Sequence, residues 1–195
     1  MFTGIIQGLG IVRQKRASSL DVGPPLGFER RLEQGTSIAV NGVCLTVSGL
    51  TKQNFQVDLS RETRSHTNLE RLRTGMRVNL ELPVAVGDGL DGHLVLGHVD
   101  TVGKITMIEG DNITGKTFMF TYPPQFSQYL TEKGSVTVDG ISLTPFDVRA
   151  ETFRCSVVPE TIERTNLQDR VLGHQVNIEF DILAKYVRKM IPHVH

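Results

Sequence analysis

The sequence predicts an all-β protein made of two similar halves, each folded as a small antiparallel barrel. The first observation is an internal repeat: residues 37–81 align without a gap with residues 135–179, and 15 of the 45 positions are identical. The second is a series of short β-prone runs in each copy, separated by glycine-rich turns. The third is the length of 195 residues, which suits two domains of about 90 to 100 residues.

A hairpin lies at the start of each copy. The run Asn-Gly-Val-Cys-Leu-Thr-Val at residues 41–47 returns as Asp-Gly-Ile-Ser-Leu-Thr-Pro at residues 139–145, 98 positions later. Asn-Gly or Asp-Gly between β-prone runs is the strongest short hairpin signal, because both residues tolerate positive φ angles. We therefore expect one tight two-residue turn in each half.

The other elements follow in chain order. Residues 4–12 are predicted to form a strand that another backbone approaches at its glycines, and residues 95–105 form its counterpart. Residues 13–36 are rich in turn formers, and Pro24-Pro25 excludes a central strand there. The later elements of the first copy are a strand, a short helix and a closing strand, at residues 55–59, 62–72 and 78–82. A twin helix and closing strand are expected at residues 160–171 and 176–180.

The tail is predicted to be helical, in contrast to everything before it. Asp181 can cap the helix, and its apolar residues share one face: Ile182, Leu183, Tyr186, Val187, Met190 and Ile191. Pro192 would end it. Because a helix of about ten residues is marginal alone, this face must pack either on its own barrel or in an oligomer. The predicted domains are residues 1–92, 93–181 and 182–195, and the last is predicted to be a trimerisation element.

Composition excludes several classes of function. Lys plus Arg and Asp plus Glu both number 21, so the net charge is zero and nucleic acid is not an expected partner. There is no run of eighteen apolar residues and hence no expected membrane span. The N-terminus lacks the basic region of a signal peptide. Cys44 and Cys155 occupy non-equivalent positions of the repeat, which favours a reducing cytoplasm, or a plastid if a transit peptide was removed.

No common catalytic or metal-binding motif is present, and neither a metal nor a cofactor is expected. His193 and His195 could bind metal only at a loose end. Between the copies, Cys44 is equivalent to Ser142, and Thr46 and Thr144 follow two residues later on the same face. These side chains could line two similar pockets. The alternative is that threonine is a good strand former and cysteine a small core residue, and spacing alone favours it.

Five motifs together resemble the riboflavin synthase family (alpha chain, lumazine-binding domains), in order and over nearly the whole chain. They are MFTGIIQG at the N-terminus, NGVCLTV at residue 41, GHLVLGHVD at residue 92, DGISLT at residue 139 and PETIERTN at residue 159. The resemblance implies two tandem six-stranded antiparallel Greek-key barrels with a C-terminal α-helix, assembled as a homotrimer. It also makes lumazine synthase a candidate partner.

The resemblance further implies the reaction. Two molecules of 6,7-dimethyl-8-ribityllumazine undergo dismutation by transfer of a four-carbon unit, which yields riboflavin and 5-amino-6-ribitylaminouracil without a cofactor. The family places this reaction where the N-terminal barrel of one subunit meets the C-terminal barrel of its neighbour. A protein with two copies of one pocket suits a reaction that consumes two copies of one molecule.

The resemblance also implies the substrate-binding residues, one set for each barrel. The N-terminal pocket is expected to comprise Gly4, Ile5, Ile6, Cys44, Leu45, Thr46, Asp58, Leu59, Ser60, Arg61, Glu62 and Thr63. The C-terminal pocket is expected to comprise Gly97, His98, Val99, Lys133, Ser142, Leu143, Thr144, Val158, Pro159, Glu160, Thr161, Ile162 and Glu163. By the same resemblance, Glu62 and Glu160 bind ribityl hydroxyls.

Five residues are candidates for catalysis. His98 is the candidate for proton transfer, because its unperturbed pKa lies near working pH; the alternative is a hydrogen-bonded interface histidine. Cys44 and Ser142 are candidates for addition to the ring or for orienting an attacking water. Asp139 and Asp181 are candidates for orienting those two side chains.

Three positions depart from the family pattern: Asp91, Leu96 and Pro145. They put the shapes of nearby loops and strand edges in doubt. An antenna protein that binds lumazine or flavin without catalysis is the alternative function, and it would be expected to lose catalytic side chains from one barrel. A flavin-reductase-like barrel would need a nicotinamide-binding domain, for which the chain has no room.

Overall fold

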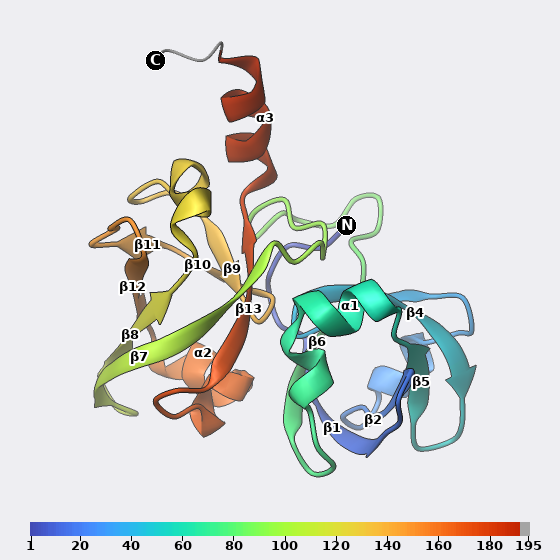
Figure 1. Cartoon of the computed structure of the whole chain (residues 1–195). Helices are drawn as coiled ribbons and strands as arrows, with labels where there is room; N and C mark the ends of the chain where they lie inside the picture. The colour runs from blue at the N-terminus through green and yellow to red at the C-terminus, as the bar shows by residue number, and fades with distance from the viewer. Residues whose placement is uncertain (192–195) are drawn as a thin grey trace.

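The structure is a computed structural model that describes residues 1–191, apart from the side chains of residues 29 and 30. Two β-rich lobes lie side by side, and a helix projects away from them (Figure 1). The predicted all-β class with two barrels and a C-terminal helix is confirmed. Pro192, His193 and His195, and with them the end of the predicted unit 182–195, lie outside the described residues. Within residues 1–191, no helix is long and apolar enough to cross a membrane.

The N-terminal lobe is a closed six-stranded antiparallel barrel. In the order β1-β2-β5-β4-β3-β6, its strands are β1 (Gly8–Lys15), β2 (Ser19–Gly23), β5 (Phe55–Asp58), β4 (Val43–Leu50), β3 (Ser37–Val40) and β6 (Arg77–Glu81). A 3-10 turn, η1 (Phe28–Arg31), lies between β2 and β3. Inward-facing aliphatic side chains such as Val22, Leu45 and Leu80 fill the barrel.

The C-terminal lobe repeats this arrangement with one strand split in two. Its order is β10-β9-β13-β7-β8-β12-β11, formed by β7 (Thr101–Asp111), β8 (Gly115–Thr121), β9 (Val136–Val138), β10 (Ile141–Leu143), β11 (Pro145–Phe146), β12 (Thr152–Val157) and β13 (Gln175–Phe180). Only Thr144 separates β10 from β11, so the two ends of the sheet are one chain segment. Pro145 lacks the N–H that would continue the ladder, which explains seven strands where six were predicted.

The two predicted hairpin turns are confirmed, and they touch each other. Asn41 and Gly42 have φ angles of 47° and 75°, and Asp139 and Gly140 have 48° and 80°, as a type I′ turn requires. A Cβ atom placed on Gly42 would lie 2.6 Å from the backbone nitrogen of Gly140. The turns therefore pack back to back, and only glycine fits at their contact.

Each predicted short helix consists of two pieces. The first copy has α1 (Arg61–His66) followed by the 3-10 helix η2 (Asn68–Arg71), and the second has α2 (Pro159–Arg164) followed by η4 (Asn166–Asp169). Thr67 and Thr165 stand between the pieces in an extended conformation, and their hydroxyls accept the N–H groups of Leu69 and Leu167. A threonine cap in the middle therefore divides what the sequence predicted as one helix.

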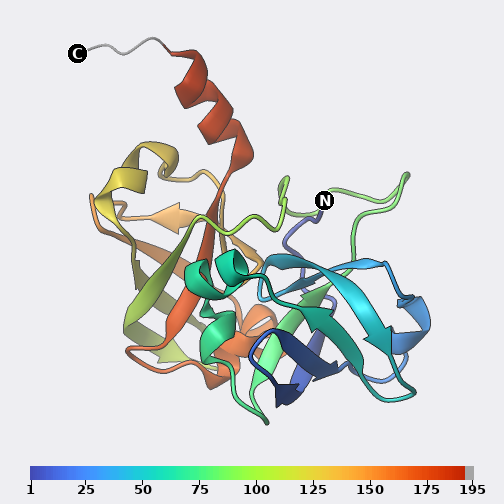
Figure 2. The same ribbon diagram turned by 45° about the vertical axis from the view of Figure 1, so that its right-hand side comes forward.

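The predicted first strands begin later than expected. β1 begins at Gly8 and β7 at Thr101, whereas strands were predicted from residues 4 and 95. The segments before them, residues 1–7 and 94–100, are called the leading arms here. The arms meet in an isolated antiparallel bridge between Phe2 and Val95, and the N-terminus lies beside the connection between the barrels (Figures 1 and 2). The predicted boundary at residues 92 and 93 falls within that connection.

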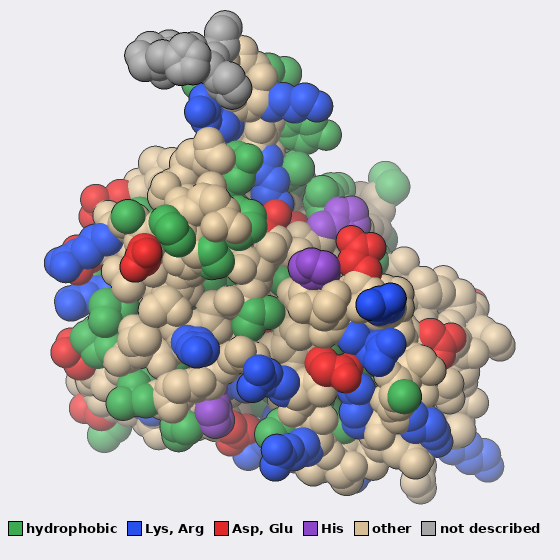
Figure 3. Space-filling view, in the orientation of Figure 1, with side chains coloured by type: hydrophobic (Ala, Val, Ile, Leu, Met, Phe, Trp, Pro, Cys, Tyr) green, Lys and Arg blue, Asp and Glu red, His purple; other side chains and the backbone are tan. Residues whose placement is uncertain are grey.

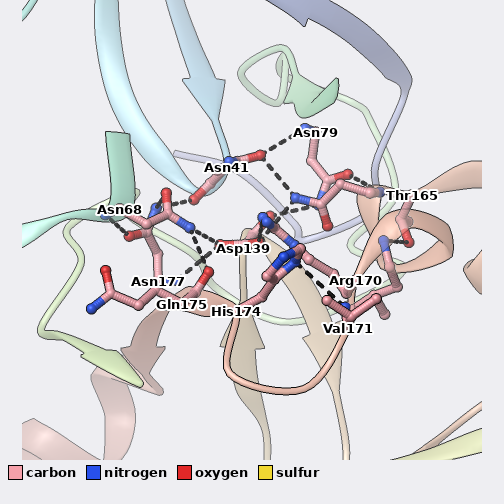
Figure 4. Close-up of polar contacts among 12 residues, drawn as sticks. Asn41, Asn68, Asn79, Asp139, Thr165, Arg170, Val171, His174, Gln175 and Asn177 are labelled. Carbon is pink, nitrogen blue, oxygen red and sulfur yellow. Dashed lines mark hydrogen bonds and ion pairs between the residues drawn. The ribbon is translucent and has the colours of Figure 1, made fainter. Parts of the chain in front are cut away.

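Six buried polar side chains, three from each repeat, meet at the seam between the barrels. Figure 4 labels Asn41, Asn68, Asn79, Asp139 and Asn177. The sixth, Asn166, donates its side-chain amide to Asp139 Oδ2 at 2.9 Å. The N–H of Asn68 donates to Asn177 Oδ1 at 2.7 Å, and the N–H of Asn166 donates to Asn79 Oδ1 at 2.7 Å. The same contact therefore occurs twice, once in each direction. This reciprocity shows that a pseudo-twofold axis relates the barrels at the seam.

The helix α3 (Ile182–Met190) begins at Asp181, whose Oδ1 accepts the N–H of Leu183 at 2.9 Å. The predicted cap is therefore confirmed. The helix projects beyond the barrels (Figures 1 and 2), and its hydrophobic side chains lie at the surface (Figure 3). Polar contacts hold it to the C-terminal lobe, as Arg188 Nε donates to Gln128 Oε1 at 2.7 Å. Tyr186 is 57% exposed and Met190 is 78% exposed. Its apolar face does not cover its own barrel, which excludes one of the two predicted arrangements for residues 1–191.

Candidate functional site

Two surface cavities lie at equivalent places on the two barrels. The first, here called the Cys44 pocket, has a volume of about 570 Å³ and is lined by Val43, Cys44, Glu62, Thr63, His66, Thr67, Gly97, His98, Val99 and Asp100. Histidine and acidic side chains gather at the surface above α1, beside the base of α3 (Figure 3). The second, the Ser142 pocket, has a volume of about 180 Å³ and is lined by Gly4, Ile5, Ile6, Ile141, Ser142, Glu160, Thr161, Arg164 and Thr165.

The nine residues of the Ser142 pocket correspond one by one to residues of the Cys44 pocket. Six lie 98 positions after their counterparts, as in the pair Cys44 and Ser142. The other three lie 93 positions before theirs, as in the pair Gly4 and Gly97. Because independent segments of both repeats come together twice in the same way, the pockets are duplicates of one ancestral site.

The leading arms cross between the barrels, which the sequence did not predict. The carbonyl oxygen of Gly97 accepts the N–H of Cys44 at 2.9 Å, and the carbonyl oxygen of Gly4 accepts the N–H of Ser142 at 2.8 Å. The expectation that Gly4, Ile5 and Ile6 line the N-terminal pocket was wrong. These residues lie beside Ser142, and residues 97–99 lie beside Cys44.

Glycine is required where each arm meets its pocket. Gly97 has a φ angle of 79° and Gly4 one of 80°. A Cβ atom on Gly97 would lie 2.5 Å from Cys44 Cβ, and one on Gly4 would lie 2.7 Å from Ser142 Cβ. The arm backbones therefore press directly against the two candidate catalytic side chains.

The Cys44 thiol faces its pocket as a protonated group. Burial raises the pKa of Cys44 above its ordinary value, and the negative charge of Glu179 adds to the shift. A thiol with a raised pKa holds little thiolate at neutral pH. Among the two proposed roles of Cys44, this environment favours orienting a water molecule over direct addition to the ring.

The sequence analysis missed His93, which is hydrogen-bonded to Ser142. The distance from His93 Nδ1 to Ser142 Oγ is 2.8 Å. Burial lowers the pKa of His93 below its ordinary value, and the charge of Asp181 opposes this shift. A neutral imidazole can accept the proton of the Ser142 hydroxyl. The signal was the Gly92-His93 pair, which comes before Gly97-His98 in the same stretch. Only the histidine of the later pair, His98, was chosen as a candidate.

His98 distinguishes the two pockets. It lies in the Cys44 pocket, whereas Ile5 takes its place in the Ser142 pocket. His98 is exposed at the pocket surface. One pocket therefore carries an imidazole on its arm, in addition to His66 in its lining, and the other carries an imidazole behind its hydroxyl.

Asp139 does not orient a pocket side chain, which corrects the prediction. It is fully buried at the seam and forms an ion pair with Arg170. Its carboxylate also accepts the side-chain amide of Asn68 at 2.7 Å and the N–H of Asn177 at 2.8 Å. Asp181 caps α3, and its link to the Ser142 pocket runs through its charge on His93.

Several predicted binding residues lie outside both cavities. Leu45, Leu59, Leu143 and Ile162 are buried in the barrel cores. Leu45 and Leu143 point inward because side chains alternate between the two faces of a strand, and Ile162 is the buried residue of α2. Thr46 and Thr144 are exposed on the same strand faces as Cys44 and Ser142. The others that line neither cavity are Asp58, Ser60, Arg61, Lys133, Val158, Pro159 and Glu163.

Lys133 stands apart from the other predicted residues. Its Nζ lies 5.9 Å from the centre of the Phe146 ring, and its own φ angle is 63°. The Lys133 side chain is exposed. Nothing among the described residues brings it to the Ser142 pocket, so its predicted role requires a ligand or a subunit that approaches from outside.

Glu62 and Glu160 remain in position for the predicted contacts with ribityl hydroxyls. Both carboxylates line their pockets near the start of a short helix. Glu160 forms an ion pair with Arg164 at 3.2 Å. Because both side chains are mostly exposed, this pair contributes little to stability, and Glu160 can exchange it for a ligand at small cost. Among residues 1–191, no group of three or more His, Cys, Asp or Glu side chains is arranged to hold a metal ion.

Comparison with known proteins identifies the repeat. A family model described as lumazine binding domain matches residues 3–83 and again residues 96–181. Riboflavin synthase from Mycobacterium tuberculosis (strain ATCC 25618 / H37Rv) is 41% identical over 199 residues, covering 98% of each chain. Those of Actinobacillus pleuropneumoniae and Bacillus subtilis (strain 168) are each 38% identical over 194 residues, covering 98% of this chain and 90% of the relative.

Solved structures with the same fold include LumP complexed with riboflavin, with a TM-score of 0.85, 23% sequence identity and coverage of 92% of this chain and 99% of that one. LumP complexed with 6,7-dimethyl-8-(1'-D-ribityl) lumazine gives a TM-score of 0.81 at 22% identity, with the same coverage. These likenesses support the fold alone. The two family matches and the full-length sequence relatives show that the chain belongs to the lumazine-binding-domain family, within its riboflavin synthase branch.

Proposed function

We propose that this chain is a riboflavin synthase. It converts two molecules of 6,7-dimethyl-8-ribityllumazine into riboflavin and 5-amino-6-ribitylaminouracil by transfer of a four-carbon unit. The observation that carries the proposal is the pair of equivalent pockets, each built from nine corresponding residues of both repeats. Two copies of one cavity match a reaction whose two substrates are the same molecule, and the riboflavin synthases to which the chain is similar match it over nearly their full length.

The chemistry requires a proton to leave the acidic ring methyl group of one lumazine and a nucleophile to add to the ring of the other. Holding two substrates in a reactive orientation can lower the barrier by up to about 7 to 11 kcal/mol. His98 in the Cys44 pocket and the His93–Ser142 pair are placed to move protons. Glu62 and Glu160 would hold the ribityl chains through their hydroxyls.

The proposed enzyme acts as a homotrimer, in which the Cys44 pocket of one subunit faces the Ser142 pocket of the next. The exposed apolar face of α3 supports assembly, because an unpartnered hydrophobic patch on a short helix marks a contact surface. The exposed Lys133 supports it too, since a facing subunit could bring a ligand to that side chain.

Mixing the purified protein with the lumazine alone tests the function. Riboflavin and the pyrimidine are expected in equal amounts, followed by absorbance and chromatography, with nothing else added. Tight binding of the lumazine without conversion would contradict the proposal and indicate the antenna function instead. Conversion that depends on an added metal or cofactor would contradict the proposed cofactor-free mechanism.

The proposed compartment is the reducing cytoplasm, and lumazine synthase is a proposed partner. Cys44 and Cys155 are both free thiols, in keeping with a reducing environment. Lumazine synthase makes the substrate in this proposal, so association would shorten the path between the two sites. Co-purification of the two proteins at physiological salt tests the association.

A further inference from the structure

Two buried carboxylates lie just behind the pockets and take no part in the proposed chemistry. Glu81 ends β6 and Glu179 lies near the end of β13, at equivalent positions of the repeat. They are only 2% and 3% exposed. A buried carboxylate costs free energy unless it is well hydrogen-bonded. Their partners therefore show what the fold gains by keeping them.

Both carboxylates hold the leading arm of their own repeat. Glu179 accepts the N–H of Leu96 on Oε1 at 2.8 Å and the N–H of Gly97 on Oε2 at 2.9 Å. Glu81 accepts the N–H of Thr3 at 2.7 Å, the hydroxyl of Thr3 at 2.9 Å and the N–H of Gly4 at 3.1 Å. Hydrogen bonds to an ionised group are stronger than neutral ones, so the carboxylates fix the arm backbones.

One residue then connects each carboxylate to the opposite pocket. The N–H of Gly97 is bound by Glu179, and its carbonyl accepts the N–H of Cys44 at 2.9 Å. In the other direction, the N–H of Gly4 is bound by Glu81, and its carbonyl accepts the N–H of Ser142 at 2.8 Å. A shift of either carboxylate therefore moves an arm that forms one wall of a pocket on the other barrel.

We propose that Glu81 and Glu179 are positioning residues with crossed action. Glu179 of the C-terminal barrel shapes the Cys44 pocket on the N-terminal barrel, and Glu81 of the N-terminal barrel shapes the Ser142 pocket on the C-terminal barrel. The proposal rests on the proposed function only in taking the lumazine as the ligand. It makes each pocket depend on an acidic side chain that never touches that ligand.

Glutamine variants test the proposal, because Glu179→Gln and Glu81→Gln keep the shape of the side chain. In Glu179→Gln the NH₂ group replaces the sole acceptor of one backbone N–H, so that hydrogen bond is lost and two donors oppose each other. In Glu81→Gln the NH₂ group can oppose the N–H of Gly4, which then keeps only its longer bond of 3.2 Å to Oε1. The two variants make the same chemical change in the two repeats. Each is therefore the matched control of the other.

The Cys44 thiol reports on its own pocket. Cys44 is partly exposed whereas Cys155 is buried, so iodoacetamide will alkylate Cys44 selectively. In the wild type, the lumazine is expected to slow alkylation of Cys44. In Glu179→Gln, the lumazine concentration that gives half protection should rise about tenfold, in line with the loss of a charge-assisted hydrogen bond. In Glu81→Gln, it should change less than twofold.

Exchanging the reporters reverses the test. In a Cys44→Ser, Ser142→Cys double variant, the thiol reports on the opposite pocket. There Glu81→Gln should raise the half-protecting concentration about tenfold, and Glu179→Gln should leave it nearly unchanged. Equal shifts with both glutamine variants at one reporter, or no shift with either, would overturn the crossed action.

Failure of the proposed function is distinguishable from failure of this proposal. If the lumazine does not protect Cys44 in the wild type, the pocket does not bind it and the proposed function fails. The alkylation rate of Cys44 without ligand still tests the positioning role, because it should change in Glu179→Gln and not in Glu81→Gln. Should a glutamine variant not fold, Glu179→Asp and Glu81→Asp provide the same comparison, since aspartate withdraws the carboxylate from the arm.

Discussion

At the scale of single residues, each pocket owes its chemistry to the differences between the repeats. Cys44 and Ser142 are equivalent, but only Ser142 has a histidine behind it, and only the Cys44 pocket has a histidine on its arm. In the proposed mechanism, proton transfer in the two pockets falls to two different histidines, His93 and His98. This division lets two pockets of common origin treat two identical substrates differently.

Replacing His98 by alanine should slow turnover far more than it weakens binding. Removal of a general acid or base typically costs about 10² to 10⁴ in kcat, whereas the exposed ring adds little to binding. Steady-state kinetics and lumazine titration measure the two effects. His174→Ala, a histidine variant outside both pockets, is the control. An unchanged kcat in His98→Ala would remove this residue from the mechanism.

The His93→Gln variant should remove part of the pH dependence of stability. Burial holds the pKa of folded His93 below its ordinary value of 6.5, so between these two pKa values the unfolded chain binds more protons. The stability from neutral His93 is fully present above pH 6.5 and is lost as pH falls through its folded-state pKa.

Urea unfolding of both proteins from pH 7 to pH 5 measures this effect. The wild type should lose stability relative to His93→Gln as the pH falls, because glutamine does not titrate. The comparison must be between the two proteins, since burial also raises the pKa values of Glu81 and Glu179. A difference between the two proteins that is constant with pH would contradict the prediction.

At the scale of elements, the hairpin turns and α3 determine how units meet. The two turns contact each other through Gly42 and Gly140, and α3 presents apolar residues to the outside. Both features are short and local, and both can be read from the sequence. The turns contact the other barrel, and α3 would contact another subunit in the proposed trimer.

Gly42→Ala should destabilise the protein more than Gly75→Ala. Both glycines have positive φ angles, of 75° and 90°, so alanine is strained at either site. A Cβ atom at Gly75 has nothing within 4 Å, whereas one at Gly42 would meet the Gly140 backbone nitrogen at 2.6 Å. Chemical denaturation should show an extra loss of about 1 to 3 kcal/mol for Gly42→Ala. Equal losses of stability would mean that the two turns can move apart without a free-energy cost.

Placing a charge on the apolar face of α3 should dissociate the proposed trimer into single chains. Val187 is 56% exposed in the single chain, and Val187→Asp would bury a carboxylate in a trimer contact. Light scattering should give three times the 21.6 kDa of one chain for the wild type and the single-chain mass for the variant. Lys189→Asp, a larger charge change beside that face, should leave the mass unaltered.

At the scale of the whole molecule, a polar seam rather than an apolar one joins the barrels. Hydrogen bonds between side chains and backbone occur in reciprocal pairs across the seam (Figure 4). Such a network fixes one orientation of the barrels, because any rotation would leave buried amides unpaired. The crossed arms need that orientation, since each must reach the opposite pocket.

The ion pair between Asp139 and Arg170 is a place where the seam loses its symmetry. The equivalent positions hold Asn41 and Leu72. Arg170→Leu should cost about 3 to 5 kcal/mol, because it leaves a buried carboxylate without its cation. The double variant Asp139→Asn, Arg170→Leu copies the first repeat and should recover most of that loss in a double-mutant cycle. Additive losses would mean that the pair is not coupled.

Local patterns predicted much of the fold. The Asn-Gly and Asp-Gly turns were confirmed, because turn type depends on two adjacent residues. β2 was missed, since Ser19–Gly23 is short and carries Asp21 and a glycine. The helix over residues 62–72 was predicted as one piece because its helical spacing rested on Leu69 and Leu72, which both follow Thr67 and therefore gave no sign of the break. These errors arise where a local propensity competes with a cap or with pairing to a distant strand.

The sequence by itself determined that there are two barrels and two pockets, because two copies of a sequence that align without a gap fold in the same way and form the same site. Only the tertiary structure decided which arm completes which pocket, that His93 backs Ser142 and that Asp139 belongs to the seam. The physical reason is that these contacts join residues 31 to 138 positions apart, and the arms bond through backbone groups that every residue shares. No pattern of side chains along the chain records such contacts.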